Sequence, residues 1–336
     1  MTERIAVLGA GAWGTTLARM LAASEHPVTL WAHRPEAAAE MVRDGQNRRY
    51  LADYPFPAGL LVTGDVSELR APHRLYILAV PSAHARGILR RVGADLAHET
   101  PFLSVVKGIE ARTQARMSEV IAEELPGRAI AVLSGPNLAD EVASGLPAGT
   151  VVASVDPALA ADVAELLGSD QFRVYTNPDV TGVELAGALK NVIALAAGLA
   201  DGLRMGDSGK AAIVTRGLAE ITRLGVAAGA DARTFAGLAG IGDLIATCMS
   251  QLSRNHRAGE LLATNMSWAD VATQLGGVAE GESTVTGALA LAQRHGVEMP
   301  IAEQVDAVIH RGRAPLEALA TLMARVQKDE LSGRET

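Results

Sequence analysis

Cysteine is almost absent from this chain of 336 residues. The one cysteine, Cys248, has no second thiol with which to form an internal disulfide. Such usage is typical of a reducing compartment, and the first apolar strand begins at residue 4 or 5, too early for a signal peptide to precede it. We therefore expect a cytoplasmic protein.

An excess of positive charge and a long apolar run are also missing. The formal net charge is −8, which disfavours nucleic acid or an anionic membrane as a partner, although a local cationic pocket can still hold a small anion. The uncharged runs 5–18 and 142–155 contain glycines and are shorter than the roughly 20 apolar residues that a membrane-spanning helix needs. We expect neither a membrane span nor a nucleic-acid partner.

Sequence patterns of metal sites and P-loops are missing as well. The eight histidines are scattered without the spacing of metal ligands. Gly209 and Lys210 resemble the end of a P-loop, but Arg204 stands where that motif has its first glycine. We expect no metal ion.

What the chain does have near its start is a glycine-rich loop between an apolar strand and a helix. The strand covers 5–8, the glycines are Gly9, Gly11 and Gly14, and the helical stretch covers 15–23. In a G-x-G-x-x-G motif the first glycine makes a tight turn, the second lets the backbone approach a pyrophosphate, and the third lets the helix pack close to the strand. Because the positive end of the helix attracts the pyrophosphate, this loop predicts a dinucleotide site.

The second strand, 28–31, lacks the acid that an NAD site usually carries. An Asp or Glu about twenty residues beyond the glycines binds the ribose 2′-hydroxyl, yet the first acid here is Glu36, after His33, Arg34 and Pro35. The guanidinium of Arg34 can bind a 2′-phosphate, with His33 beside it, so NADPH is favoured or at least accepted beside NADH. Alternatively, Arg34 is one solvated arginine among many.

The order of predicted elements divides the chain into two domains. Hydrophobic residues make up 49% of it, enough for two cores, since single cores stop growing near roughly 250–300 residues. Asn177, Pro178 and Asp179 are typical of the start of a long helix, and beyond them we find helical patterns alone. We expect an α/β protein with an N-terminal Rossmann-type doubly wound sheet over 1–177 and an all-α domain over 178–336. The further predicted buried strands are 75–80, 102–106, 130–133, 150–155 and 172–175.

Polar residues follow two of the predicted strands. Lys107 comes directly after one of them, and the turn 134–137, with Gly135 and Asn137, comes after the next. Open α/β sheets bind ligands at the carboxyl ends of their strands, so these residues are candidates for a binding site. An ordinary surface lysine would produce the same pattern at Lys107.

The long helix after Asn177 carries a lysine inside an apolar stretch. Residues three and four positions from Lys190, among them Ala186, Gly187 and Ala194, are mostly small, so a ligand could lie against the ammonium. Burying a lysine is costly unless it is paired or partly neutral, and burial would lower its pKa toward the range of an acid–base catalyst. A lysine that extends to the surface is the alternative.

A third group combines glycines with opposite charges. The segment 237–248 contains three glycines, which reduce helix stability and usually mark a close backbone approach. Asp243 within it and Arg254 after it would bring opposite charges to this place. A charged pair that joins two helices is the alternative.

Together these residues resemble the bacterial-type NAD(P)-dependent glycerol-3-phosphate dehydrogenases over nearly the whole chain. Ten ordered matches make the resemblance specific. They are G-A-G-A-W-G at 9–14, V-K-G at 106–108, S-G-P at 134–136, E-L-A-G-A-L-K-N at 184–191, D-G at 201–202, T-R-G-L at 215–218, G-L-A-G-I-G-D-L at 237–244, S-R-N at 253–255, V-A-E-G at 278–281 and M-P-I at 299–301.

The resemblance implies a role for each matched residue. It implies that Lys190 donates and accepts the proton, that Asp243 and Thr247 act with it, and that no metal is required. The implied substrate contacts are Lys107, Gly135, Asn137, Lys190, Asn191, Asp243, Ser253, Arg254 and Asn255. The implied cofactor contacts are Gly9, Gly11, Ala12, Trp13, Gly14, His33, Arg34, Lys107, Ala139, Arg254, Val278 and Glu280.

Three positions depart from the usual family pattern. Asn137 stands where Ser or Thr is usual, which puts that substrate contact in doubt, and Ala12 lacks a hydroxyl that could contact phosphate. Ser208 replaces a usual Asn. None of the three touches the proposed catalytic lysine.

The expected reaction is hydride transfer between NAD(P)H and dihydroxyacetone phosphate, giving sn-glycerol 3-phosphate for phospholipid synthesis. Two other functions compete with it. A β-hydroxyacid dehydrogenase would carry an Asn four residues after the lysine, but position 194 is Ala and the Asn is adjacent, at 191. A non-catalytic NADPH sensor would need neither Lys190 nor a phosphate site. The sequence leaves the direction of the reaction and the oligomeric state open, a homodimer included.

Overall fold

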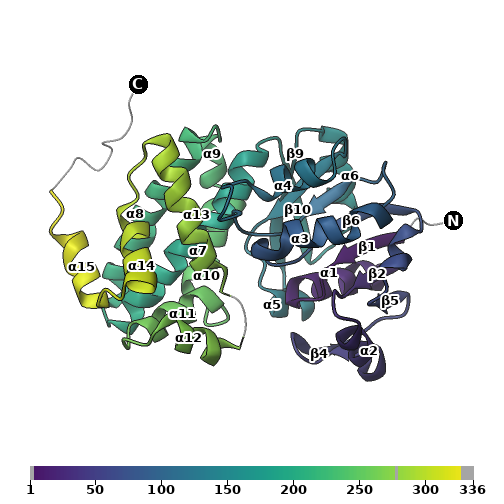
Figure 1. Ribbon diagram of the computed structural model, residues 1–336, viewed down its shortest axis with the longest axis horizontal. Helices are drawn as coiled ribbons and strands as arrows, with labels where there is room; N and C mark the ends of the chain where they lie inside the picture. The colour runs from purple at the N-terminus through teal and green to yellow at the C-terminus, as the bar shows by residue number, and fades with distance from the viewer. Residues whose placement is uncertain (1–3, 277–278, 327–336) are drawn as a thin grey trace. The chain divides into compact units, whose positions relative to one another are not determined.

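The computed structural model describes residues 4–276 and 279–326, which belong to two compact units (Figure 1). Unit 1 contains the chain up to Gly108 together with Ala115–Glu184. Unit 2 contains Ile109–Gln114 and the chain from Leu185 onward. One helix, α7 (Val180–Gly202), therefore begins in unit 1 and continues into unit 2.

Unit 1 is built on an eight-stranded sheet with the order β10-β9-β8-β7-β6-β1-β2-β5. All neighbouring strands are parallel except β8 and β9, which are antiparallel. The strands are β1 (Arg4–Leu8), β2 (Val28–Trp31), β5 (Leu60–Thr63), β6 (His73–Leu78), β7 (Phe102–Ser104), β8 (Ile130–Ser134), β9 (Ala148–Ser154) and β10 (Phe172–Asn177). The predicted Rossmann-type sheet is confirmed. The prediction missed β5 and the small hairpin of β3 (Gln46–Asn47) and β4 (Leu51–Pro55).

Helices cover both faces of this sheet, which is why its strands are apolar on both sides. One core lies under α1 (Ala12–Ala23), α2 (Pro35–Asp44), α5 (Ala139–Ala143) and α6 (Pro157–Leu167). The other lies under α3 (Ser82–Val92), α4 (Met117–Glu124) and the short η1 (Val66–Arg70), with η2 (Gly93–Asp95) directly after α3. Loops follow the carboxyl ends of β1, β2, β7 and β8. Sheets of this kind bind their ligands at that edge.

From Leu185 onward, the described residues of unit 2 form helices and no strand, as predicted (Figure 1). Its longest helices are α7 and α8 (Gly206–Ala227), and most of α7 is buried among the others. The remaining elements are α9 (Ala232–Phe235), the π-helix η3 (Leu238–Gly242), α10 (Asp243–Met249), α11 (Arg254–Leu262), α12 (Trp268–Leu275), α13 (Glu280–His295), α14 (Pro300–Arg311) and α15 (Pro315–Met323).

The helix α7 is also apolar enough to meet the length and composition test for a membrane span. The mean hydropathy of its best window is 1.5, and that whole window is buried inside the protein, as in the core helix of a soluble protein. Among the described residues, a second candidate arises only if the bent pair 232–249 and 254–262 is counted as one segment. The uncharged runs considered from the sequence did not include α7, because Glu184 and Lys190 interrupt it.

The start of α7 differs from the prediction by two residues. Asn177 is the last residue of β10, where it pairs with Ala153, so the backbone is still extended at the predicted N-cap. The helix begins at Val180, and the carboxylate of Asp179 accepts a hydrogen bond from the Gly182 N–H at 2.8 Å. Asp179 therefore caps the helix in place of Asn177. Sheet pairing extends the strand further than the local sequence indicates.

Glycines bring α7 and α11 into close contact in unit 2. A Cβ atom at Gly198 would lie 1.9 Å from the carbonyl oxygen of His256, and one at Gly259 would lie 2.2 Å from that of Leu195. Both distances are far below van der Waals contact. The two backbones can therefore pack at this separation only if neither position carries a side chain.

Candidate active site

In unit 1 the predicted glycine loop joins β1 to α1. Gly9 has a φ of +120°, and a Cβ there would lie 2.4 Å from the Ala79 carbonyl oxygen. A Cβ at Gly14 would lie 2.1 Å from the Gly9 oxygen, so the helix packs directly on the turn. A Cβ at Gly11 would meet no atom within 4 Å. The loop thus leaves open space at Gly11, beside the start of a 12-residue helix whose N-cap makes no side-chain hydrogen bond, and this arrangement fits a pyrophosphate.

Asn47, which the sequence analysis did not identify, holds this loop in place. Its side chain is buried, and Nδ2 donates to the carbonyl oxygen of Ala10 at 2.9 Å and to Oγ1 of Thr15 at 2.8 Å. Asn47 lies in the short strand β3, where no local pattern distinguishes it from a loop asparagine. Asn47 is therefore a positioning residue for the glycine loop.

The other predicted contacts in the loop region lie on α1 and α5. Ala12 begins α1, and the indole of Trp13 packs 6.3 Å from the Phe172 ring, with its buried Nε1 making no hydrogen bond in the described structure. Ala139 begins α5, and its carbonyl oxygen accepts a hydrogen bond from Thr16 at 3.2 Å. These residues therefore lie around one end of α1.

Two basic residues follow β2, where the sequence predicted a 2′-phosphate site. Both His33 and Arg34 are exposed, and Arg34 is the N-cap residue of α2. Although the residue is exposed, nearby protein atoms remove part of the water from the His33 ring, and this desolvation lowers its pKa. The positive charges of Arg34 and Arg91 and the nearby His84 lower the pKa further. The surroundings of His33 are therefore electropositive, as an anion-binding site requires.

The ends of β7 and β8 bring Lys107, Gly135 and Asn137 together. The Lys107 ammonium donates to the Gly135 carbonyl oxygen at 2.9 Å. The side chain of Asn137 donates to the Gly149 oxygen at 3.2 Å and accepts from the Thr150 hydroxyl at 2.8 Å. Both ends of the Asn137 amide are therefore engaged with β9, which leaves less of it for a substrate.

In unit 2 Lys190 is buried against two polar side chains of α10. Its ammonium forms an ion pair with Asp243 and donates to the Thr247 hydroxyl at 2.6 Å. The Thr247 hydroxyl in turn donates to the Asp243 carbonyl oxygen at 2.7 Å. Lys190 is 5% exposed and Asp243 is 2% exposed, so water does not screen this pair. Lys190 therefore does not extend to the surface.

The segment before α10 shows why Asp243 is held there. Asp243 directly follows the π-helix η3, and a Cβ at Gly240 would lie 2.1 Å from the Phe235 carbonyl oxygen. The close backbone approach predicted for this glycine-rich segment is therefore present. Asp243 pairs with Lys190, whereas Arg254 is exposed in the first turn of α11. The alternative of an Asp243–Arg254 pair joining two helices is not what the structure shows.

Asn191, next to Lys190, has an unused hydrogen-bond donor. The Gly281 N–H donates to Oδ1 of Asn255 at 3.0 Å, which fixes the orientation of that amide. Nδ2 of Asn255 then donates to Oδ1 of Asn191 at 2.9 Å. The buried Nδ2 of Asn191 makes no hydrogen bond in the described structure, and an unpaired buried donor is costly. It is therefore a candidate to bind a ligand oxygen.

The remaining predicted residues of unit 2 lie at two helix starts. Ser253 caps α11, where its hydroxyl accepts from the His256 N–H at 3.2 Å, and Arg254 is the first residue of this nine-residue helix. Glu280 begins α13, and Val278 lies outside the described residues. The N-terminus of α11 thus combines a helix dipole with an arginine, a combination that favours anions.

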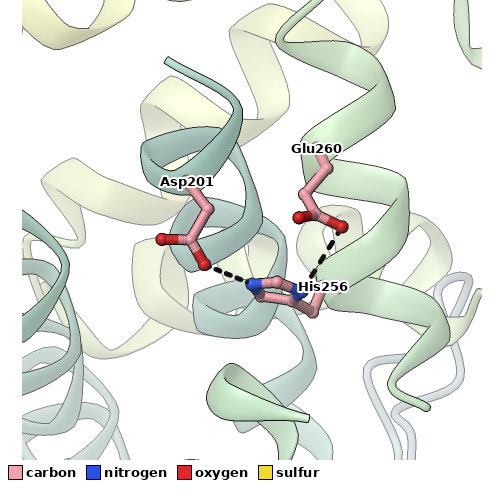
Figure 2. A group of neighbouring side chains, drawn as sticks. All are labelled: Asp201, His256 and Glu260. Atoms are coloured by element: carbon pink, nitrogen blue, oxygen red, sulfur yellow. Dashed lines mark hydrogen bonds and ion pairs between the residues drawn. The ribbon is translucent and has the colours of Figure 1, made fainter. Parts of the chain in front are cut away.

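A cluster near the other end of α7 was not apparent from the sequence (Figure 2). The buried His256 lies between two carboxylates, 2.7 Å from Asp201 and 3.7 Å from Glu260. Three such side chains can hold a metal ion, but the Lys210 ammonium already lies 2.9 Å from the same Asp201 oxygen. Partial burial alone would raise the pKa of Asp201, yet the hydrogen bonds from Lys210 and His256 lower it. We assign the cluster to the packing of α7 against α8 and α11.

Known proteins match this chain over nearly its whole length. The family models described as NAD-dependent glycerol-3-phosphate dehydrogenase N-terminus and C-terminus match residues 4–160 and 179–320. Curated glycerol-3-phosphate dehydrogenases [NAD(P)+] of Moorella thermoacetica and Thermobifida fusca are 46% and 48% identical, over 98% of this chain and 98% and 99% of their own. The chain belongs to the NAD-dependent glycerol-3-phosphate dehydrogenase family.

Solved structures agree with membership of this family. The crystal structure of glycerol-3-phosphate dehydrogenase from Coxiella burnetii is 38% identical, with a TM-score of 0.93 over 96% of this chain and 99% of its own. A ketopantoate reductase from Ralstonia eutropha, at 19% identity and a TM-score of 0.61, shares the fold alone. The resemblance found in the sequence motifs is therefore confirmed.

Proposed function

We infer that this chain is an NAD(P)-dependent glycerol-3-phosphate dehydrogenase that interconverts dihydroxyacetone phosphate and sn-glycerol 3-phosphate. The observation that carries the proposal is the buried group of Lys190, Asp243 and Thr247 in a chain of this family. A protein that only sensed NADPH would not need a buried lysine paired in this way. A reductase needs one to supply a proton.

We assign most of the cofactor contacts to 1–177 and most of the substrate contacts to 178–336. The glycine loop of unit 1, with Trp13 and Ala139, would hold the pyrophosphate, and His33 and Arg34 would hold the adenosine end. When bound, the nicotinamide supplies or accepts the hydride at the C2 carbon of the substrate. Val278 and Glu280 lie in 178–336 and are assigned to the cofactor by family resemblance.

Lys190 is the proposed proton donor for ketone reduction. As the C2 carbon is reduced, negative charge develops on its oxygen, and a positioned acid that donates a proton there lowers the barrier. The Lys190 ammonium has three N–H bonds, one of which we assign to this oxygen. In the reverse direction the neutral amine would remove the proton from the alcohol.

Asp243 and Thr247 fix the position of this ammonium and restore its charge. After proton transfer the amine would be neutral while the buried Asp243 carboxylate stayed charged. A buried charge without its partner is unfavourable, so the pair drives Lys190 to regain a proton. The Thr247 hydroxyl, 2.6 Å from Nζ, restricts the direction of the remaining N–H bonds.

The substrate phosphate is assigned to the start of α11. Arg254 offers a planar, charged donor, and the helix N-terminus around Ser253 and Asn255 favours anions. The donor of Asn191 is assigned to a substrate oxygen near Lys190. Lys107, Gly135 and Asn137 are assigned to the substrate as well, with Asn137 the weakest of them because β9 engages its amide.

One steady-state experiment tests the function. The purified chain should oxidise both NADH and NADPH in the presence of dihydroxyacetone phosphate, and dihydroxyacetone without phosphate should be a poor substrate, because remote binding energy positions the reacting carbon. An enzyme that binds the cofactor but turns over no dihydroxyacetone phosphate would contradict the proposal. Equal use of both ketones would contradict the phosphate assignment.

The proposal extends to the setting of the reaction. A cytoplasmic location is supported by the single cysteine, Cys248, which has no second thiol with which to form an internal disulfide. We also propose a homodimer, which light scattering would test, and a role for the product in phospholipid synthesis.

A further inference from the structure

Arg91, near the end of α3, lies beside the residues that follow β2. Its Cζ atom lies 5.6 Å from the centroid of the Trp31 ring, and Nη1 donates to the carbonyl oxygen of His33 at 3.1 Å. Trp31 is fully buried and is the last residue of β2. The guanidinium is therefore held by two contacts, one with an aromatic ring and one with a peptide oxygen.

The two other arginines of α3 have a different environment. Arg86 and Arg90 both form ion pairs with the carboxylate of Glu124 on α4, at 2.6 and 2.9 Å. The hydrogen bond of Arg91 goes to a neutral carbonyl, which does not neutralise its charge. A guanidinium has five N–H donors, and this contact uses one of them.

The basic groups at this place come from two separate segments of unit 1. His33 and Arg34 follow β2, and His84 and Arg91 lie on α3. After β2 the first carboxylate in the sequence is Glu36, within α2. Arg34 and Arg91, the two guanidinium groups of this set, both lie close enough to His33 to lower its pKa. Their positive charges repel one another unless an anion lies between them, so the arrangement points to a bound anion at the end of β2.

We propose that Arg91 determines cofactor specificity together with Arg34, by binding the 2′-phosphate of NADPH. The proposal rests on the function inferred above and adds to it a residue that no sequence motif marks. A planar guanidinium matches a phosphate with two parallel hydrogen bonds. Because Trp31 and the His33 carbonyl already hold the group in place, binding costs little side-chain entropy.

The test compares Arg91→Met with Arg90→Met. Both variants remove a guanidinium from the same helix and keep an apolar side chain, but Arg90 is paired with Glu124. We would titrate each protein with 2′,5′-ADP and with 5′-AMP by calorimetry, which requires no turnover. Arg91→Met should lower the affinity for 2′,5′-ADP by about tenfold or more and the affinity for 5′-AMP by less than about twofold. Arg90→Met should change neither affinity by more than about twofold.

Kinetics give a second, independent measurement. The KM for NADPH should rise in Arg91→Met by a similar factor, with the KM for NADH and kcat nearly unchanged. Arg91→Lys, which keeps the charge but loses the planar fork, should fall between the wild type and Arg91→Met. The ratio of the KM for NADPH to the KM for NADH does not depend on how well each variant is expressed.

Several results would overturn the proposal. Equal weakening of 2′,5′-ADP and 5′-AMP would mean that Arg91 only supports the turn after β2. An unchanged affinity for 2′,5′-ADP, an equal effect of Arg90→Met, or a wild type that binds 2′,5′-ADP no more tightly than 5′-AMP would each reject it. If the wild type turned over no dihydroxyacetone phosphate, the proposed function would fail, while the calorimetry would still decide the role of Arg91.

Discussion

The substitution Lys190→Met separates the chemistry of the buried lysine from its contribution to stability. Methionine keeps the apolar stem and removes the ammonium. A positioned general acid contributes roughly 10²–10⁴ to the rate, so kcat should fall by that factor, equivalent to about 3–5 kcal/mol in activation free energy. Binding of NADPH at the glycine loop of unit 1 should survive.

The same substitution leaves Asp243 as a buried charge without a partner. Asp243 is 2% exposed, and removing one member of a buried pair costs about 3–5 kcal/mol in the free energy of unfolding. Adding Asp243→Asn removes the remaining charge and should recover most of that loss. It should recover none of the activity, because the proton donor is still missing.

Lys190→Arg is the companion variant. Arginine keeps a positive charge that could polarise the ketone, but it cannot release and regain a proton near neutral pH. It should therefore remain nearly as slow as Lys190→Met. A rate restored by arginine would mean that Lys190 polarises the ketone without transferring a proton.

The assays are steady-state kinetics at saturating dihydroxyacetone phosphate and urea unfolding of each variant. A folded Lys190→Met enzyme within about tenfold of the wild-type kcat would refute the assignment, since that loss is below the range for such a catalyst. Recovery of activity together with stability in the double variant would show that the ion pair acts only on the fold.

Three other side chains, Arg34, Arg254 and Glu220, allow separate tests. Arg34→Ala should weaken the binding of NADPH by about 1–3 kcal/mol, the value of one charge-assisted contact, and leave the binding of NADH unchanged. An unchanged ratio of the KM values for NADPH and NADH would count against a contact between Arg34 and the 2′-phosphate. Arg254→Ala should raise the KM for dihydroxyacetone phosphate while changing the free energy of unfolding by less than about 0.5 kcal/mol, and undiminished discrimination against dihydroxyacetone would show that the phosphate lies elsewhere. Burial raises the pKa of Glu220 from 4.5 to about 7, although the N–H groups of Ile301 and Ala302 oppose this shift. The folded state therefore binds the Glu220 proton more tightly than the unfolded state does, and this contribution to stability is lost as the proton dissociates. The free energy of unfolding should fall by about 3 kcal/mol on this account as the pH rises from 4.5 to 7. Urea unfolding of Glu220→Gln, which has no such proton, should not show this decrease.

The fold was largely predictable because it depends on patterns that are local in the sequence. Apolar runs such as 102–106 and 130–133 appear as β7 and β8, and the glycine loop is where the motif placed it. The errors in the prediction arise where pairing between strands decides the structure of a segment. β5 (Leu60–Thr63) gains its pairing from β2, and Asn177 remains extended because β10 pairs with β9 through it.

The contacts of the candidate site were less predictable, because they join residues far apart in the chain. Lys190 and Asp243 were named through their motifs, but their ion pair depends on how α7 packs against α10. No pattern in the sequence indicates that Asn47 holds the glycine loop or that Arg91 reaches His33. Such partners are decided by tertiary packing.

The glycine contact between α7 and α11 limits how this protein can be engineered for heat resistance. Exchanging a helical glycine for alanine commonly stabilises a protein by about 0.4–1 kcal/mol, because the unfolded chain becomes less flexible. At Gly198 and Gly259 the new methyl group would overlap the facing backbone, so the exchange would separate the two helices. Gly87 in α3 offers the opposite case, since a Cβ there meets no atom within 4 Å. A thermostable variant is therefore better sought on the exposed helices of unit 1 than in the core of unit 2.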